Sequence, residues 1–515
     1  MKRIVSSSLY FYFLLIVILF PIIFFPISSD ISIFALGGKT IAQGGNIYAD
    51  YLDLKPPMIF IIYAFLYKII GISEIALRLF DVILQMFTAI LIFRFVKDYF
   101  ENKNAAIFSA IAYSLSYSTL SYSQTLDPES FVGLIIMYVL FLINKNSINT
   151  LLKYFIIGVL LGFMASMKFT MATVPFCIIF FDLFIKKIEK KGVFINTIIL
   201  LTGFLVIFAL SFIPIINHES WNNFNLVMEY LKFHSSQPPI NAEFIKESIK
   251  NIGIFFGDNY SIALIIFLTL GFSVYNKFKS KGSFDNFSLI LLILIALFIS
   301  IAAERKFSIY HFSRMYALLS IIVGFGASIY YNNIQKVFKT SAINKIMMSI
   351  ALIFILLLSP VPRLVNNYIP TAQYFLNKDK YNHFYQRNDA QNIRETYLKT
   401  AKKINYEITD KSLGLIIAIG GNQINYFFKD AKYSKFSQSL FYFGNFKVQR
   451  WQEEFERELE SAKIVAVQTN DIHPILTGHT KSSFQLLSDS KYNDYFLNNF
   501  HLIDTNDCFR IYKRK

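Results

Sequence analysis

The residues best suited to chemistry lie between Asp30 and Pro57, in a polar stretch that separates two apolar runs. It contains three carboxylates and Lys55, and two glycine pairs at which we expect the chain to turn: Asp30, Asp50, Asp53, Gly37-Gly38 and Gly44-Gly45. A carboxylate beside an apolar wall has a raised pKa, so Asp30 is a candidate general base. The competing interpretation is a solvated loop in which Asp30 only ends a helix.

The sequence Asp53-Leu54-Lys55-Pro56-Pro57 is the most specific part of this stretch. Two consecutive prolines impose an extended entry into the next helix. Side chains alternate along an extended segment, so we expect Asp53 and Lys55 to share one face. A lysine at headgroup depth can pair with a phosphate. The competing interpretation is that its side chain only extends to the membrane surface and binds no ligand. Asp30 and Asp53 are therefore candidate catalytic residues, and Lys55 is a candidate substrate-binding residue.

Charged residues also lie at the start of one predicted helix and inside another. Asp127, Pro128 and Glu129 fit a helix start, with Asp127 as the N-cap and Pro128 in the first position. The same rigid start could hold Asp127 and Glu129 toward a site. Arg78 lies inside the predicted helix Ser73–Val96, where it either anchors the outer end or binds a phosphate.

A third group of charged residues, Glu304-Arg305-Lys306, precedes His311 at another predicted outer helix end. Two cations and a histidine suit a phosphate or pyrophosphate. The competing interpretation is an aromatic belt from which charged side chains reach the membrane surface. We take Arg305 and His311 as candidate substrate-binding residues, together with Arg78, Asp127 and Glu129.

The sequence contains no zinc-ligand spacing, Walker loop or nucleophile elbow. Gly420-Gly421 follows a predicted strand, but no further glycine pattern completes a nucleotide-binding loop. Metal ligation by Asp30, Asp53 and Asp127 is chemically feasible, yet no spacing indicates it. We therefore predict no metal site and no cofactor, and we leave a requirement for a divalent metal open.

These residues must be positioned by a largely apolar chain. It has 515 residues, of which 54% are hydrophobic and 16% charged. Many apolar runs approach the ~18–20 residues that cross a bilayer, which predicts an α-helical polytopic membrane protein with an uncleaved first span. The runs lie near residues 8–29, 57–70, 74–96, 104–122, 130–144, 151–168, 171–187, 194–216, 257–276, 286–303, 312–331 and 345–362.

Lysine-rich loops indicate how many of these runs cross the membrane. Met58–Ile70 is short and polar enough to be an interfacial helix in the first outer loop, which leaves about eleven transmembrane helices. With the N-terminus in the cytoplasm, the short basic loops then all lie inside. These loops contain Lys97, Lys103, Lys145, Lys153, Lys186, Lys187, Lys190, Lys191, Lys277, Lys279, Lys281, Lys336, Lys339 and Lys345. The same asymmetry accounts for the net charge of +16, so no nucleic-acid partner is predicted.

The composition becomes polar and mixed after Pro360. We predict a transmembrane catalytic domain over residues 1–362 and a small extracytoplasmic α/β domain over residues 363–515, which helps to choose the acceptor. The expected elements of the tail are two buried strands, a Glu-rich helix and a last strand: Leu413–Ile419, Ile464–Gln468, Trp451–Ala462 and Phe509–Tyr512. Two cysteines, Cys177 and Cys508, do not make a disulfide framework.

The motifs of the first outer region resemble those of the GT-C glycosyltransferases of the protein O-mannosyltransferase and aminoarabinose transferase type. The resemblance covers residues 8–362 and is most specific over residues 30–79. It rests on Asp30, Gly44-Gly45-Asn46-Ile47-Tyr48, Asp53-Leu54-Lys55-Pro56-Pro57 and Gly71-Ile72-Ser73-Glu74-Ile75-Ala76-Leu77-Arg78-Leu79. The segment from Arg305 to Tyr310-His311 is similar to a motif of bacterial members.

This resemblance implies a reaction. Such enzymes take a hexosyl or pentosyl unit from a polyprenyl-phosphate carrier, not from a nucleotide sugar. A single inverting displacement moves it to a lipid, glycan or protein acceptor on the outer side of the membrane. For this chain the implied place is a bacterial inner membrane, with the site and the tail facing the periplasm or exterior.

The resemblance also implies residue roles. Asp30 matches the aspartate that activates the acceptor, and Lys55 matches a residue that contacts the carrier phosphate. Asp53 stands where relatives often have a glutamate. The aspartate side chain is shorter, so its carboxylate reaches less far. Asp127 and Glu129 match an acidic pair at the second outer loop. Arg305 and His311 are carried over from the bacterial motif, with Arg305 helping Lys55 to stabilise the departing phosphate.

Two other classes of function remain open from the sequence. A membrane transporter or lipid and oligosaccharide flippase would need ionisable residues at mid-bilayer depth, for which Lys168 and Asp182 are the main candidates. No internal repeat supports a transporter built from inverted halves. A lipid-A or O-antigen ligase-like enzyme is the third alternative, and the Asp53–Pro57 and Arg78 motifs argue against it.

The proposed topology predicts the side on which the tail lies. A reporter fused after Pro362 should be active outside the cytoplasm, because the eleven-span arrangement places the lysine-rich loops inside. Alkaline phosphatase and a cytoplasmic fluorescent reporter at the same position give the paired measurement. Cytoplasmic activity of the fusion would overturn the span count.

Overall fold

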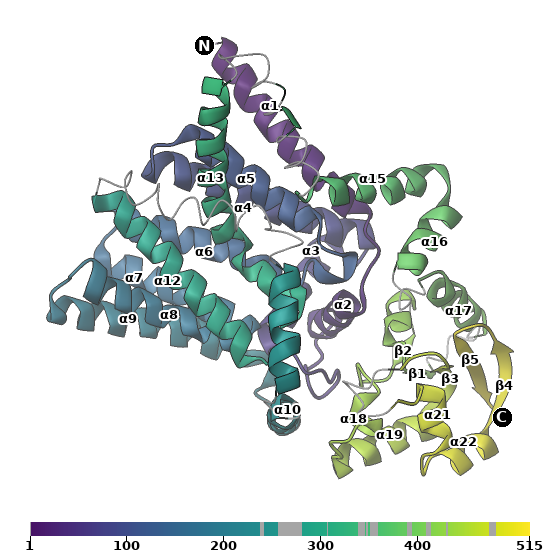
Figure 1. The fold of residues 1–515 in the computed structure, drawn as a ribbon. Coiled ribbons are helices and arrows are strands. Elements are labelled where there is room, and N and C mark those ends of the chain that lie inside the picture. Colours follow the sequence, from purple (N-terminus) through teal and green to yellow (C-terminus); the bar gives the residue numbers. More distant parts are fainter. Residues whose placement is uncertain are drawn as a thin grey trace. The chain divides into compact units, whose positions relative to one another are not determined.

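The structure is a computed structural model that describes residues 2–236, 242–255, 281–305, 307–337, 346, 349–350, 359–388, 394–407, 414–428, 431–472 and 480–515. The chain divides into two compact units, each assembled from segments far apart in sequence (Figure 1). Unit 1 contains Met1–Phe25, Ser73–Ser211 and Pro238–Ala372. Unit 2 contains Pro26–Ile72, Phe212–Gln237 and Gln373–Lys515. The domain division predicted at residue 362 remains a prediction.

Unit 1 is helical over its described residues. Its elements are α1 (Lys2–Leu19), η1 (Phe20–Phe24), α4 (Glu74–Tyr99), α5 (Lys103–Ser118), η2 (Tyr122–Gln124), α6 (Pro128–Asn144), α7 (Thr150–Met167), η3 (Phe169–Thr173), α8 (Val174–Phe180), the π-helical η4 (Phe181–Ile185), α9 (Lys190–Leu210), α12 (Lys281–Ala303), η6 (Ile309–Met315) and α13 (Tyr316–Val337). The helix α15 (Val361–Leu376) carries the chain from unit 1 into unit 2. Helix α4 begins as predicted at Ser73, whose hydroxyl accepts from the Ala76 N–H at 3.1 Å.

Apolar composition makes this a multi-pass membrane protein. Within the described residues, five helices are long and apolar enough to cross a membrane: Glu74–Tyr99, Thr150–Met167, Lys190–Leu210, Phe284–Ala303 and Tyr310–Ile329. The bent pair Leu9–Phe24 and Ser29–Ala42 makes a sixth if it counts as one span. The predicted span near 257–276 lies outside the described residues, as does most of the one near 345–362. The count of about eleven therefore stays a prediction.

Helices α7 and α9 pack closely because glycines lie at their contact. A Cβ added to Gly158 on α7 would come within 2.0 Å of the Leu200 carbonyl oxygen, and one on Gly203 of α9 would come within 2.2 Å of the Phe155 carbonyl oxygen. A Cβ on Gly162, one turn after Gly158, would come within 2.5 Å of the Phe204 carbonyl oxygen. Small residues four apart permit this approach of two backbones inside a membrane.

The first apolar run does not continue to Asp30 as one helix. Pro21 and Pro26 interrupt it, and the axis turns by 80° between Leu9–Phe24 and Ser29–Ala42. The chain then begins α2 (Ser29–Ala42), with Ser28 as the N-cap. Asp30 therefore lies in the first turn of a second helix, which corrects the prediction that it ends the first span.

Two helices at the start of unit 2, α2 and α3 (Pro57–Ile70), pack side by side. The prediction that Gly37-Gly38 turns the chain is wrong, because both residues lie inside α2. A Cβ on Gly37 would come within 2.4 Å of Phe60, and one on Gly38 within 2.5 Å of the Tyr63 backbone. The glycine pair thus allows close packing of α2 on α3.

A mixed five-stranded sheet forms the other part of unit 2. Its strands are β1 (Leu415–Ile419), β2 (Lys432–Tyr433), β3 (Ala462–Gln468), β4 (Phe500–Thr505) and β5 (Phe509–Arg514), in the order β2-β1-β3-β5-β4. Strand β1 is parallel to β2 and β3, whereas β5 is antiparallel to β3 and β4. The two predicted strands that became β1 and β3 and the predicted last strand β5 are confirmed.

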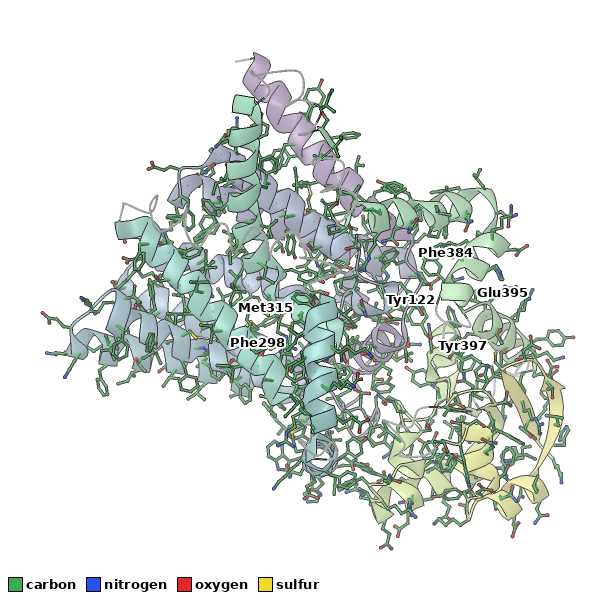
Figure 2. All side chains as sticks on the ribbon, viewed as in Figure 1. Tyr122, Phe298, Met315, Phe384, Glu395 and Tyr397 are labelled. Atoms are coloured by element: carbon green, nitrogen blue, oxygen red, sulfur yellow. The ribbon has the colours of Figure 1, made fainter. Side chains whose placement is uncertain are left out.

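The remaining helices of unit 2 are α10 (His218–Ser236), α16 (Lys378–Asn388), α17 (Arg394–Glu407), η7 (Asn422–Phe427), α18 (Leu440–Phe443), α19 (Gln449–Ser461), α21 (Ser483–Ser488) and α22 (Asn493–Asn499), with η5 (Ile213–Ile215) before α10. Of these, η7 and α19 pack against β1, α21 packs against β3, and α22 packs against β4. Tyr397 on α17, labelled in Figure 2, packs on Phe509 of β5 with ring centres 5.6 Å apart. On the predicted Glu-rich helix α19, Trp451, Phe455 and Leu459 are buried, as the spacing of an amphipathic helix requires.

Candidate functional site

Asp30 and Lys55 form an ion pair in unit 2. Lys55 Nζ lies 3.5 Å from Asp30 Oδ2, and it also lies over the ring of Phe34, 5.5 Å from the ring centre. About a third of each charged side chain remains accessible, 33% for Lys55 and 38% for Asp30. The structure therefore brings together the predicted base and the predicted phosphate ligand, and it leaves both open to a substrate.

The starts of two helices lie at this ion pair. Phe34 of α2 contacts Phe60 and Tyr63 of α3, and one turn later Gly38 lies against Tyr63 and Ala64. Contacts therefore advance in the same direction along both helices, which places the two N-termini at the same end. Helix N-termini present free backbone N–H groups and partial positive charge, so together with the lysine they favour an anion.

Asp53 does not share one accessible face with Lys55, contrary to the sequence-based expectation. Residues 54 and 55 form a bend, and the Lys55 N–H donates to Asp53 Oδ1 at 3.0 Å. The Asp53 carboxylate is fully buried and also accepts from Ser437 Oγ at 2.6 Å and Gln438 Nε2 at 3.3 Å. Burial raises the pKa of Asp53, although the Ser437 hydrogen bond and the Lys55 charge oppose that shift. The bend sends the two side chains to different partners.

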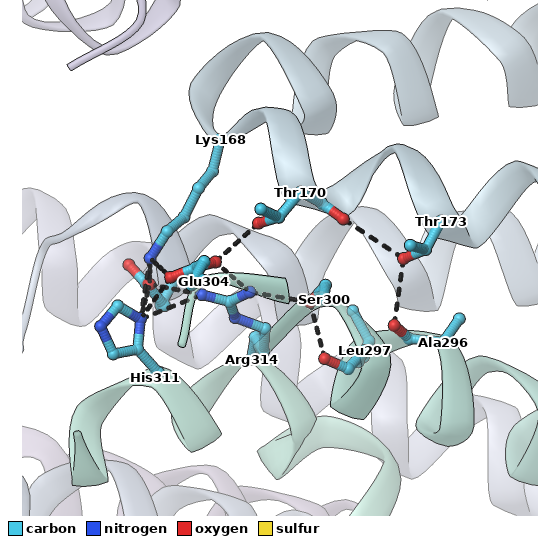
Figure 3. Close-up of polar contacts among 10 residues, drawn as sticks. Lys168, Thr170, Thr173, Ala296, Leu297, Ser300, Glu304, His311 and Arg314 are labelled. Atoms are coloured by element: carbon cyan, nitrogen blue, oxygen red, sulfur yellow. Dashed lines mark hydrogen bonds and ion pairs between the residues drawn. The ribbon is translucent and has the colours of Figure 1, made fainter. Parts of the chain in front are cut away.

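A second polar cluster lies inside unit 1 (Figure 3). It joins Glu129, at the start of α6, to four residues that follow or interrupt apolar helices: Lys168, Glu304, His311 and Arg314. Arg314 donates to Glu129 Oε1 at 2.8 Å and to Glu304 Oε1 at 2.9 Å. Lys168 Nζ lies 2.5 Å from Glu129 Oε1 and 2.8 Å from Glu304 Oε2. Two cations thus neutralise two carboxylates.

His311 contacts both the cations and the carboxylates of the cluster. Its Nδ1 lies 2.8 Å from Lys168 Nζ and 3.2 Å from an Arg314 nitrogen, both of which can only donate. The carboxylate oxygens of Glu129 and Glu304 each lie 3.1 Å from the same nitrogen. Nδ1 thus lies within hydrogen-bond distance of two donors and two acceptors. The other ring nitrogen, Nε2, is buried and has no hydrogen-bond partner among the described residues.

Charge within the cluster keeps Glu304 ionised. Burial alone would raise the pKa of Glu304, but the positive charges of Lys168 and Arg314 outweigh burial and hold that pKa below its ordinary value. Glu129, Glu304 and His311 offer three ligand atoms within 4.8 Å of one another, a set that could hold a metal ion. Lys168 Nζ lies within 2.8 Å of all three of these atoms.

Arg78 is buried and braces the polypeptide backbone. Its guanidinium donates to the Phe25 carbonyl at 3.3 Å, to Thr125 Oγ1 at 2.7 Å and to the Tyr122 carbonyl at 2.9 Å. Tyr122 is labelled in Figure 2. Only 1% of Arg78 is accessible, so in this structure it fixes the loop before α6 and is not open to a phosphate.

Two other predicted residues lie near the unit 1 cluster in sequence. Asp127 occupies the predicted N-cap position of α6 and is buried, but its side chain makes no capping hydrogen bond. Arg305 follows Glu304 directly and is half-buried, with a left-handed backbone at φ 52°. Such a conformation is uncommon for a residue other than glycine.

Sequence reasoning missed the main cation of the cluster and noticed another for a different reason. Arg314 lies inside the predicted apolar run 312–331, where a buried arginine requires a carboxylate partner. The sequence indicates Lys168 only as a candidate transport residue, and it predicts no role for Glu304. An unexplained charge in an apolar run was the available signal for Arg314.

Comparisons with known proteins agree with the resemblance of the motifs. Residues 54–217 match the family model described as dolichyl-phosphate-mannose-protein mannosyltransferase. The fold is similar to a crystal structure of ArnT from Cupriavidus metallidurans bound to undecaprenyl phosphate, with a TM-score of 0.60 and 11% identity over 98% of each chain.

Two further similarities are more limited. The crystal structure of an Archaeoglobus fulgidus oligosaccharyltransferase, tethered to an acceptor peptide, gives a TM-score of 0.49 and 11% identity over 89% of this chain and 69% of that one. An uncharacterized protein of Aquifex aeolicus (strain VF5) is 31% identical over 103 residues, which are 19% of this chain and 21% of that protein. The match thus spans about a fifth of that relative.

The predicted resemblance to GT-C glycosyltransferases is therefore confirmed, by the family match and by the fold. The family match begins at Leu54 and includes Lys55, Arg78 and Glu129. Asp30 and Asp53 precede the matched range, so their roles rest on geometry and on the motifs around them.

Replacement of Arg314 by Met should destabilise unit 1 strongly. It removes a donor from Glu129 and Glu304 and leaves buried negative charge under-compensated, which typically costs about 3–5 kcal/mol. We expect a lower unfolding midpoint in detergent, with partial recovery when Glu129→Gln is added. Arg94→Met, on the exposed face of α4, is the matched control. An Arg314→Met protein as stable as the wild type would contradict a structural role for the cluster.

Proposed function

We propose that this protein is a membrane glycosyltransferase that moves a sugar from a polyprenyl-phosphate carrier to a lipid, glycan or protein acceptor. The observation that carries the proposal is the accessible Asp30–Lys55 ion pair at the N-termini of α2 and α3. It combines a base for an acceptor hydroxyl with a cation for a phosphate leaving group. The family match over residues 54–217 supports the same reaction class.

Asp30 is the proposed general base. Its carboxylate lies in the first turn of α2, 3.5 Å from the Lys55 ammonium. An arriving carrier phosphate competes with Asp30 for the Lys55 ammonium. The carboxylate is then released to take a proton from the acceptor hydroxyl.

The reaction is a single displacement at the anomeric carbon. The acceptor oxygen forms a bond to that carbon and gives its proton to Asp30. The bond from the anomeric carbon to the phosphate oxygen breaks, and its electron pair leaves with the polyprenyl phosphate. Attack from the side opposite the leaving group inverts the configuration. Lys55 and the nearby backbone N–H groups stabilise the charge that grows on the phosphate, which is often the largest catalytic contribution.

Residues of unit 1 have separate proposed roles. Arg305 is proposed to contact the carrier, and its uncommon left-handed backbone supports a functional constraint at that position. Asp127 is retained as a proposed substrate-binding residue at the start of α6. Glu129, His311 and Arg78 are proposed to position helices, because their polar groups contact other buried residues.

The proposed location is a bacterial inner membrane with the site on its outer side. The long prenyl chain of the donor then stays in lipid while the sugar meets the acceptor. A transporter or flippase receives no comparable support, because Lys168 pairs with Glu129 and Glu304, and Asp182 accepts a hydrogen bond from Tyr154. The charge of Lys168 is therefore compensated within the protein.

Loss of the protein should leave one class of surface glycoconjugate short of one sugar. Mass spectrometry of envelope glycans and lipids, from cells with and without the gene, measures the missing mass and identifies the acceptor. The matching polyprenyl-phosphate sugar should accumulate, because its consumer is absent. Unchanged glycans together with an unchanged donor pool would contradict the proposal.

Substitutions of Asp30 and of Lys55 should affect different steps of the reaction. Asp30→Asn keeps the side-chain shape and removes its basicity, so turnover should fall by roughly 10²–10⁴ while carrier binding survives. Lys55→Met keeps the aliphatic stem and removes the charge, so affinity for undecaprenyl phosphate should fall first. Product formation by the purified variants, and binding of undecaprenyl phosphate in detergent micelles, are the measurements.

Matched controls lie on the same elements. Asp50→Asn changes an exposed carboxylate of the same loop, and Lys68→Met changes an exposed lysine of α3. Both controls should retain activity. Near-normal transfer by Asp30→Asn would remove Asp30 as the base.

A further inference from the structure

The backbone around Lys55 is joined to residues nearly four hundred positions later in the chain. The Leu52 N–H donates to the Lys435 carbonyl at 2.7 Å, and the Ser437 N–H donates to the Leu52 carbonyl at 3.1 Å. Leu52 and Phe436 thereby form a parallel β-bridge. The loop before Lys55 is thus held like a short added strand.

One hydrogen-bond chain reaches the amide of Lys55. Ser437 Oγ donates to Asp53 Oδ2 at 2.6 Å, and Gln438 Nε2 reaches the same oxygen at 3.3 Å. The other oxygen, Oδ1, accepts the Lys55 N–H at 3.0 Å. Asp53 is fully buried, so its carboxylate serves as a bridge between Ser437 and the Lys55 peptide.

A second chain reaches the carbonyl of the same residue. Trp451 Nε1, on α19, donates to Asn223 Oδ1 at 3.1 Å, and Asn223 Nδ2 donates to the Tyr48 carbonyl at 2.9 Å. The Tyr48 hydroxyl then donates to the Lys55 carbonyl at 2.6 Å. Trp451, Asn223 and Tyr48 are all buried, so water does not compete for these bonds.

The two chains fix Lys55 from both sides of its backbone. Its side chain pairs with Asp30 at 3.5 Å, lies over the Phe34 ring and remains one-third accessible. Pro56 and Pro57 restrict the backbone after Lys55 but donate no hydrogen bond. The direction in which the ammonium leaves the backbone therefore depends on Ser437 and Trp451.

We propose that Ser437 and Trp451 are positioning residues for Lys55, acting through Asp53 and through Asn223 and Tyr48. The C-terminal part of unit 2 thereby sets the geometry of the site that receives the carrier phosphate. This inference rests on the proposed function for its consequence in carrier binding. In this assignment Asp53 is a positioning residue and not a base.

Removal of the Ser437 hydroxyl tests the first chain. Ser437→Ala leaves the buried carboxylate one donor short, and a hydrogen bond to a charged group is worth about a tenfold change or more in an equilibrium. We expect the Kd for undecaprenyl phosphate to rise about tenfold, with a smaller change in kcat. Ser437→Thr keeps the hydroxyl and should restore affinity. Ser461→Ala removes a hydroxyl that bonds only within α19 and should have no effect.

A double-mutant cycle separates positioning from general weakening of the fold. If Ser437 acts through the Lys55 ammonium, then Ser437→Ala should have no further effect on carrier affinity in a Lys55→Met protein. Independent, additive effects in the double variant would overturn the proposal. Trp451→Phe, which keeps an aromatic ring and removes the donor, tests the second chain in the same way.

Hydrogen exchange gives a readout that requires no substrate. Pro56 and Pro57 carry no amide hydrogen, so a peptide covering residues 53–57 reports on few amides, including that of Lys55. Ser437→Ala should speed exchange in this peptide, and Ser461→Ala should not. If wild-type protein fails to bind undecaprenyl phosphate, the proposed function fails while this exchange result still decides the positioning role. Unchanged exchange in Ser437→Ala would overturn that role.

Discussion

A carboxylate can stay ionised inside an apolar helix bundle only if cations reach it. In unit 1 that constraint applies to Glu129 and Glu304, and Arg314 and Lys168 meet it. The four residues come from the start of α6, the end of α7, the end of α12 and η6. Their geometry therefore depends on how these helices end, and the helices cannot shift without separating buried charges.

The same constraint explains why the helix ends of unit 1 are so rich in polar contacts. Arg78 ties α4 to the loop before α6 through the Tyr122 carbonyl and the Thr125 hydroxyl, and to the end of η1 through the Phe25 carbonyl. Thr170 of η3 donates to Glu304 at 2.6 Å, and Ser300 of α12 accepts from Arg314 at 2.8 Å. Apolar packing supplies the bundle, as the glycine contacts of α7 and α9 illustrate. Polar contacts then specify the register of the helices at their ends.

The sequence was informative where local rules govern structure. Hydrophobic runs and caps predicted α4 and α6 well, and short runs typical of strands predicted β1, β3 and β5. Helix α2 was not foreseen, because Gly37-Gly38 indicates a turn until a neighbouring helix is known to pack there. Composition also left the number of spans open, since several apolar helices fall short of a bilayer's thickness.

The candidate site was only partly visible in the sequence for a similar reason. Asp30 and Lys55 could be chosen from their types and their place beside apolar runs. Arg314 meets Glu129 across 185 positions, and Asp53 meets Ser437 across 384. No local spacing encodes such pairings. The expectation that Asp53 and Lys55 share one face failed because a bend formed where an extended strand was assumed.

The distance in sequence between Asp53 and Ser437 bears on how the protein is made. A ribosome completes the segment around Lys55 long before it reaches Ser437 and Trp451. During that interval the loop lacks the hydroxyl that bonds Asp53 and the indole that bonds Asn223. In a nascent chain the loop around Lys55 therefore lacks the hydrogen bonds that depend on Ser437 and Trp451. It acquires them only when the late segment has been translated and has folded onto it.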